Sequence, residues 1–251
     1  MVKDTRFRLG SLGGLAQERA QVEGGQAAQA GIDEGLRAYM LRVYNYMASG
    51  VALTGIVAYV VANVDALKNV IFGTPLMWVV MFAPLIVVFA ISARINKMSA
   101  ASAQTWFWAF AGLMGLSLAS VFIHFTGESV ARVFFITAAT FGAMSIYGYT
   151  TKRDLSGLGS FLYMGLIGII IAMVVNMFIA SSALQFAISV IGVLVFVGLT
   201  AYDTQKIKNE YIATDSGELM AKKSIMGALR LYLDFINLFM MLLHLIGVAR
   251  D

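Results

Sequence analysis

Two aspartates near the ends of long apolar stretches have the residue type and position to carry chemistry. Asp203 lies in Gly-Leu-Thr-Ala-Tyr-Asp-Thr-Gln-Lys at 198–206, and Asp234 lies in Leu-Tyr-Leu-Asp-Phe-Ile-Asn at 231–237. An acid inside a membrane span is costly and needs a partner, so we expect these two to pair with each other. Such a pair would share a proton, and losing the proton would separate two helices or admit a cation. Calcium prefers oxygen ligands of this kind, so Asp203 and Asp234 are also predicted to bind it transiently.

The depths of the two acids match. Asp203 precedes Lys206 by three residues and Asp234 follows Arg230 by four, which places each acid about 5–6 Å inside the same boundary of the membrane. A simpler interpretation stays open for both. Asp203 would then be an interfacial residue neutralised by nearby basic side chains, and Asp234 would pair with Arg230 at the i, i+4 spacing of a helix.

Other polar residues could support the pair or serve only the membrane interface. Arg94 ends an apolar stretch on the same side and could reach either acid, although its commoner role is to extend toward lipid phosphate. Asn237, one turn beyond Asp234, could donate to a carboxylate or bond a neighbouring helix. His124 and Glu128 share one helix face at a spacing seen in metal sites, but two ligands do not make a site, and an interfacial polar pair is favoured.

Composition defines the class of protein. The chain of 251 residues is 59% hydrophobic and 13% charged, with a mean hydropathy of +0.79, which indicates a membrane protein with several spans. Cysteine is absent, which excludes disulfides and thiolate chemistry. No nucleophile elbow, phosphate-binding loop or zinc-protease helix is present, and 225–248 contains no lysine for a retinal Schiff base. We therefore expect neither an enzyme nor a cofactor, and the net charge of +4 predicts lipid contact rather than a nucleic-acid partner.

Uncharged stretches locate seven membrane-spanning helices, because about 20 apolar residues cross the hydrocarbon layer. The stretch from Asp154 to Asp203 would reach about 70 Å as one helix, so it must fold back, and Ala-Ser-Ser-Ala at 180–183 is the natural turn. The predicted spans lie between Arg42 and Asp65, Lys68 and Arg94, Lys97 and Glu128, and Arg132 and Lys152, then at 157–179, 183–205 and 225–248. The second contains Pro84, whose freed carbonyl neighbouring helices must cover.

The predicted organisation is an all-α membrane domain at 36–251, preceded by a flexible polar tail at 1–35. Of the 18 lysines and arginines, all but Lys68, Arg132 and Arg250 fall on one side of the seven spans. By the positive-inside rule that side is cytoplasmic and holds the amino terminus, while the carboxyl terminus lies on the far side. A re-entrant seventh segment would return the carboxyl end to the inside, and the sequence leaves this alternative open.

Three segments carry a resemblance to bacterial members of the Bax inhibitor-1 family, also called the transmembrane BAX inhibitor motif family. They are Gly-Leu-Thr-Ala-Tyr-Asp-Thr-Gln-Lys-Ile-Lys at 198–208, Ala-Leu-Arg-Leu-Tyr-Leu-Asp-Phe-Ile-Asn-Leu-Phe at 228–239, and Arg-Val-Tyr-Asn-Tyr-Met at 42–47. The resemblance covers about residues 36–250 and implies a bundle of seven helices in which the last is central and the other six surround it. It also implies a location in the bacterial inner membrane.

The resemblance further implies a pH-sensitive calcium leak in which Asp203 and Asp234 form the pH sensor and gate. An arginine of the second helix latches the acids in such proteins, and Arg94 is the candidate here, with Arg230 and Asn237 in supporting positions. Some members carry another acid midway along that helix, where this sequence has only apolar residues and Pro84. A role for a further pore carboxylate is therefore not expected.

Competing functions follow from the same sequence. The first is a passive, proton-gated pathway with calcium as the permeant ion and the lipid bilayer as its surroundings. The second is a non-conducting partner that modulates a membrane protease or a stress-related complex; bacterial members of the family are associated with the protease FtsH, and the polar tail at 1–35 is the feature that suggests it. An ion-coupled transporter is a weaker third, because neither a pair of broken helices nor an inverted repeat is evident.

Overall fold

The computed structural model describes the backbone of residues 4–250 and the side chains of residues 31–250. Its described elements are helical, and seven of the helices are long and apolar enough to cross a membrane. The predicted class, an all-α protein with seven spans, is thereby confirmed. The elements are α1 (Asp4–Asn63), α2 (Asp65–Phe72), α3 (Leu76–Arg94), a 3-10 turn (Ile95–Lys97), α4 (Ala100–His124), α5 (Gly127–Thr150), α6 (Ser156–Ile179), α7 (Ser182–Asn209) and α8 (Gly217–Ile246).

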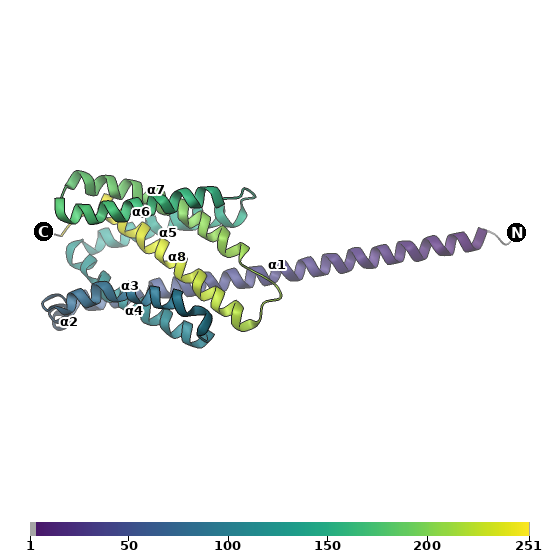
Figure 1. Ribbon diagram of the computed structural model, residues 1–251, viewed down its shortest axis with the longest axis horizontal. Helices are drawn as coiled ribbons and strands as arrows, with labels where there is room; N and C mark the ends of the chain where they lie inside the picture. Colours follow the sequence, from purple (N-terminus) through teal and green to yellow (C-terminus); the bar gives the residue numbers. More distant parts are fainter. Residues whose placement is uncertain (1–3, 251) are drawn as a thin grey trace.

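Helix α1 differs from the predicted tail. It runs without a break from Asp4 to Asn63, so the backbone has no boundary at residue 35, and the amino-terminal part of the helix projects from the bundle (Figure 1). The polar segment contains Ala, Gln, Glu and Arg, which favour helix, as well as several glycines, which do not. It continues the helix of the first span, and extending a helix costs less than starting one. The flexibility of this segment and its cytoplasmic location remain predictions.

The second predicted span is shorter than the charge-free interval because Gly73-Thr74-Pro75 divides it. The Gly73 N–H closes α2 by donating to the Asn69 carbonyl at 2.9 Å, and Pro75 lies at the start of α3, where its missing N–H costs no helical hydrogen bond. Residues 65–72 therefore form a separate short helix outside the span.

Pro84, inside α3, is accommodated as expected for a proline in a membrane helix. Proline has no N–H to pair with the carbonyl four residues earlier, which here belongs to Val80. The Ser117 hydroxyl of α4 donates to that carbonyl, with an Oγ–O distance of 2.5 Å. A neighbouring helix therefore supplies the donor that Pro84 lacks, and this contact holds α3 against α4.

The predicted turn after the fifth span is confirmed. Helix α6 ends at Ile179 and Ala180 adopts a left-handed conformation with φ of 53°. Asn176 Oδ1 accepts from the Ser181 N–H at 3.0 Å, and the Ser181 hydroxyl caps α7 by accepting from the Leu184 N–H at 3.3 Å. The uncharged stretch therefore folds into two antiparallel helices, α6 and α7, which pack side by side.

Helix α8 is the most buried of the spans and packs against α1, α4, α5 and α7. Helix α3 packs chiefly against α4, and α6 chiefly against α7, so the structure does not confirm that all six other spans surround α8. At 30 residues the helix is about 45 Å long, enough to cross the bilayer.

The described residues after α8 pack against the turn between α4 and α5, at the far end of α8 from its first residue. Thr126 N–H donates to the Val248 carbonyl at 3.1 Å, and Arg250 N–H donates to the His124 carbonyl at 2.8 Å. These bonds tie the chain after α8 to the turn between α4 and α5. The seventh segment is therefore one continuous span, and the re-entrant alternative is not supported.

Candidate acidic site between the last two helices

Asp203 of α7 and Asp234 of α8 come together where these antiparallel helices pack. The side chains are buried, with 3% of Asp203 and 5% of Asp234 exposed. The two carboxyls lie close enough to interact electrostatically. The sequence predicted this juxtaposition from the matched depths of the two acids, and the structure places them accordingly.

The Asp234 carboxyl is incompletely satisfied. Its Oδ2 is buried and has no hydrogen-bond partner among the described residues, and Asp203 is the group that acts on this carboxyl most strongly. Ionised carboxylates only accept hydrogen bonds, so two of them cannot bond to each other unless one carries a proton. A single shared proton would supply the missing donor and remove one of two buried negative charges.

Tyr163 of α6 is a third member of the site that the sequence analysis missed. Its hydroxyl donates to the Asp203 carboxylate, at 3.2 Å from Oδ1 and 3.5 Å from Oδ2. The signal available in the sequence was a tyrosine inside an apolar span, because a tyrosine hydroxyl surrounded by hydrocarbon usually finds a partner. Which partner it finds depends on how α6 packs against α7.

A glycine sets that packing. A Cβ at Gly159 of α6 would overlap the Tyr202 ring, so only glycine lets this ring of α7 lie directly against α6. The Tyr202 and Tyr163 rings then meet edge to face at 5.9 Å between centroids. The same close approach brings the Tyr163 hydroxyl to Asp203, the residue that follows Tyr202.

Arg230, rather than Arg94, is the arginine near the acid pair. The charge of Arg230 attracts both carboxylates, and its Nη1 binds Glu210 Oε1 at 2.9 Å. Arg94 is exposed at the end of α3, and within residues 31–250 no hydrogen bond or ion pair joins it to either aspartate. The structure therefore does not bring Arg94 to the acid pair, because α3 packs on α4, away from the contact of α7 with α8.

Asn237 and His124 bond to their own helices. Asn237 Nδ2 donates to the Leu233 carbonyl at 2.8 Å, and its supporting role toward Asp234 stays a prediction. His124 Nδ1 lies 2.8 Å from the Ser120 carbonyl. Glu128 lies in the first turn of α5, where the helix dipole favours a negative charge.

The described residues contain no group of three or more histidine, cysteine, aspartate or glutamate side chains that could hold a metal. A stable calcium site takes about 6–8 oxygen ligands. Asp203 and Asp234 alone therefore fall short of a stable calcium site, and their transient binding of a cation stays a prediction. His124 is the last residue of α4 and Glu128 lies in the first turn of α5, so the two do not share one helix face as expected.

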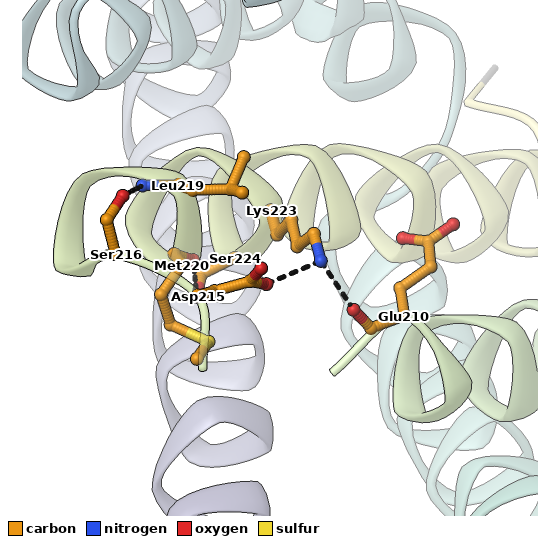
Figure 2. Close-up of polar contacts among 7 residues, drawn as sticks. All are labelled: Glu210, Asp215, Ser216, Leu219, Met220, Lys223 and Ser224. Carbon is orange, nitrogen blue, oxygen red and sulfur yellow. Dashed lines mark hydrogen bonds and ion pairs between the residues drawn. The ribbon is translucent and has the colours of Figure 1, made fainter. Parts of the chain in front are cut away.

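The loop between α7 and α8 holds the side chain of Arg230 in place. Lys223 Nζ donates to the Glu210 carbonyl at 2.8 Å and to Asp215 Oδ2 at 2.5 Å, and Figure 2 shows the ammonium group between these two residues. The Ser216 hydroxyl caps α8 by accepting from the Leu219 N–H at 3.2 Å. With its backbone held by Lys223, Glu210 presents its carboxylate to Arg230, so the loop positions the positive charge beside the acid pair.

The end of α7 also fixes the turn between α5 and α6. Gln205 Oε1 accepts from the Leu155 N–H at 2.9 Å, and its Nε2 donates to the Arg153 carbonyl at 2.8 Å. At the start of α6, Asp154 Oδ1 accepts from the Ser156 N–H at 2.9 Å, and hydrogen bonds from Ser156 hold the pKa of Asp154 below its usual value. The last turns of α7, which include Asp203, are therefore tied to the start of α6 by hydrogen bonds.

The fold and the site together define a membrane protein of seven helices with a buried acidic pair between the last two. The chain matches over residues 36–251 the family model described as "Inhibitor of apoptosis-promoting Bax1". It is 50% identical over 219 residues to "Inner membrane protein YbhL" of Escherichia coli, which covers 86% of this chain and 94% of that protein. The chain therefore belongs to the Bax inhibitor-1 family.

Two further relatives extend this similarity across bacteria. The protein RP147 of Rickettsia prowazekii is 50% identical over 219 residues, which are 87% of this chain and 93% of that protein. The membrane protein SpyM3_0260 of Streptococcus pyogenes is 37% identical over 218 residues, which are 86% of this chain and 94% of that protein. The printed names of the Escherichia coli and Streptococcus proteins agree with the membrane class that the helices of this chain define.

Proposed function

We propose that this protein is a passive cation pathway, with calcium as the permeant ion, which the Asp203–Asp234 pair closes by holding a proton and opens by losing it. The observation that supports the proposal is the proximity of two buried carboxyls, one of which has an oxygen without a hydrogen-bond partner among the described residues. The proposal needs neither a catalytic residue nor a resident cofactor.

The closed state depends on the shared proton. With the proton present, one carboxyl donates to the other and α7 is held to α8. Without it, two unit charges about 4 Å apart repel by roughly 4 kcal/mol at the effective dielectric constant of about 20 that suits a protein site. Arg230 offsets this repulsion only in part, because its guanidinium group is shared with Glu210.

The repulsion between the two carboxylates can be relieved in two ways, and both favour conduction. The helices can separate at the acid pair, or a cation can enter and neutralise the two carboxylates. Calcium suits the second because it carries two charges and prefers oxygen ligands. Its residence would be short, because two carboxylates provide only a fraction of the ligands that a stable calcium site takes.

The proposal is tested by calcium flux into liposomes that contain the purified protein and a trapped calcium indicator. Flux should be low under acidic conditions and rise as the pH increases, since the rise in pH removes the shared proton. In the Asp203→Asn, Asp234→Asn variant the pH dependence should disappear, because neither side chain can lose a proton. A double variant whose flux follows pH as the wild type does would rule the mechanism out.

A second candidate function rests on α1. Its amino-terminal part projects from the bundle as a helix (Figure 1), which supports docking of another protein such as the membrane protease FtsH. Deleting residues 1–30 leaves intact Gly35, whose backbone packs against the Tyr211 side chain, so the bundle should still fold. Loss of co-purifying protease together with unchanged calcium flux would support a partner function on the same scaffold, whereas unchanged co-purification would contradict it.

A further inference from the structure

A cavity opens between α1 and α5 on the side of the bundle where α7 ends and α8 begins. It measures about 480 Å³ and is lined by Arg37, Met40, Leu41 and Tyr44 of α1 and by Gly142, Ser145, Ile146 and Tyr149 of α5. Helix α1 packs against α4 and α8, and α5 packs against α7 and α8, so these two helices form the walls of a groove.

The groove changes from polar to apolar along its length. Arg37 and Tyr149 lie at the end nearest the α7–α8 loop, because Lys208 of α7 donates to the Tyr149 carbonyl at 2.8 Å. The lysine ammonium also lies 5.1 Å from the centre of the Tyr149 ring. One cation from α1 and one from α7 therefore flank the mouth. Deeper in, the walls are apolar side chains, and Leu41 is 52% exposed and Ile146 67% exposed.

A buried hydroxyl without a partner also lines the groove. Ser145 is 5% exposed, and its Oγ has no hydrogen-bond partner within the described part of the chain. Most serines in membrane helices bond to a carbonyl of their own helix, as Thr150 does to Ile146 at 2.7 Å. Ser145 retains a free donor, and it lies about 6 Å along α5 from Tyr149 at the mouth.

We propose that this groove binds a phospholipid of the leaflet that adjoins the α7–α8 loop. The phosphate binds Arg37, and a glycerol ester carbonyl accepts a hydrogen bond from the Ser145 hydroxyl. An acyl chain lies along Met40, Leu41 and Ile146. The order of the groups fits this molecule, since a phospholipid presents an anion, then ester acceptors, then hydrocarbon. Guanidinium binds phosphate oxygens well, and the unpaired hydroxyl is the donor that the ester needs.

Gly142 provides a way to close the groove without disturbing the fold. A Cβ at this position would meet nothing within 4 Å, so the side chain of a Gly142→Leu variant would project into the cavity. Gly168 of α6 is a matched control, because a Cβ there also meets nothing within 4 Å and the residue is exposed on a helix outside the groove. Both variants should fold and should keep their thermal stability.

The test is native mass spectrometry of the full chain in detergent, titrated with dioctanoyl phosphatidylglycerol. One lipid should bind to the wild type and to Gly168→Leu, and none should be retained by Gly142→Leu. Arg37→Gln should weaken binding about tenfold, the effect of one charge-assisted hydrogen bond, and Ser145→Ala should weaken it severalfold. Inorganic phosphate should not compete, because it lacks the acyl chain.

Three results would overturn the assignment. Equal lipid binding by Gly142→Leu and the wild type would place the lipid elsewhere, and competition by inorganic phosphate would make the site one for a free anion. A dimer mass that falls in Gly142→Leu without any lipid adduct would make the groove an interface between two copies of the chain. None of these measurements depends on calcium flux, so the lipid site can fail or hold independently of the proposed pathway.

Discussion

The substitution Asp234→Asn should lock the proposed gate in its closed state. An asparagine at this position has nearly the shape of the protonated aspartate, and its amide can donate to the Asp203 carboxylate at every pH. The wild-type pair needs a proton to form the same bond, because ionised carboxylates only accept hydrogen bonds, and Asp234 Oδ2 has no donor among the residues that the structure describes.

The size of the effect follows from that single bond. A hydrogen bond to a charged group contributes about 1.5–3 kcal/mol, and each 1.4 kcal/mol changes a two-state population about tenfold. The open fraction of Asp234→Asn under alkaline conditions should therefore be about 10- to 150-fold below that of the wild type. Under acidic conditions the two proteins should differ little, because the wild-type pair then also holds its hydrogen bond.

Calcium flux into indicator-loaded liposomes, measured as the pH is raised from acidic to alkaline, compares the open fractions of the two proteins under both conditions. The matched control is Asp65→Asn, which makes the same chemical change at an exposed residue whose side chain pairs with Lys68 at 2.7 Å, away from the acid pair. This control should keep the wild-type pH profile. If flux through Asp234→Asn rose with pH as steeply as flux through the wild type, the shared proton could not be the gate.

Three further predictions concern the surroundings of the acid pair and the packing of the bundle. Tyr163→Phe removes a donor that favours the ionised form of the pair, so the midpoint of flux should move to higher pH by about one unit, the equivalent of one hydrogen bond; an unmoved midpoint would exclude a role for this hydroxyl. Gly148→Ala should lower the free energy of unfolding by about 1–3 kcal/mol, because its Cβ would overlap a backbone carbonyl of α7. The melting temperature should fall accordingly, whereas Gly142→Ala, which has open space around its Cβ, should leave it unchanged. Thr54→Val should lower the free energy of unfolding by about 1–3 kcal/mol, because it removes the partner of the Tyr232 hydroxyl, which lies 2.6 Å from Thr54 Oγ1. Adding Tyr232→Phe should restore part of the melting temperature that the single variant loses.

The spans and the turn at 180–183 could be predicted because hydropathy and charge are local properties of the chain. The two differences between the predicted and the observed helix boundaries have local causes as well. Gly73-Thr74-Pro75 is a helix break within an uncharged interval, and a search based on charge alone does not see it. The segment before residue 35 lacks an apolar face but contains good helix formers, and continuation from a formed span costs less than starting a new helix.

The candidate site was predictable only in part. Asp203 and Asp234 are found from sequence because an acid is rare in an apolar span and its depth can be counted from the neighbouring basic residue. Tyr163 and Arg230 are harder to assign, since tyrosine and arginine are common at membrane boundaries. Arg94 satisfied the same criteria of depth and charge as Arg230, and only the packing of α3 on α4 distinguishes them.

The sequence by itself determined that the chain crosses a membrane seven times and that two acids lie at one depth, because these properties depend on composition and on distance along a helix. The tertiary structure decided which groups face those acids. That choice depends on the rotation of each helix about its axis and on which helices touch. Both are set by contacts between distant segments, such as Gly159 with Tyr202 and Glu210 with Arg230, which no local pattern encodes.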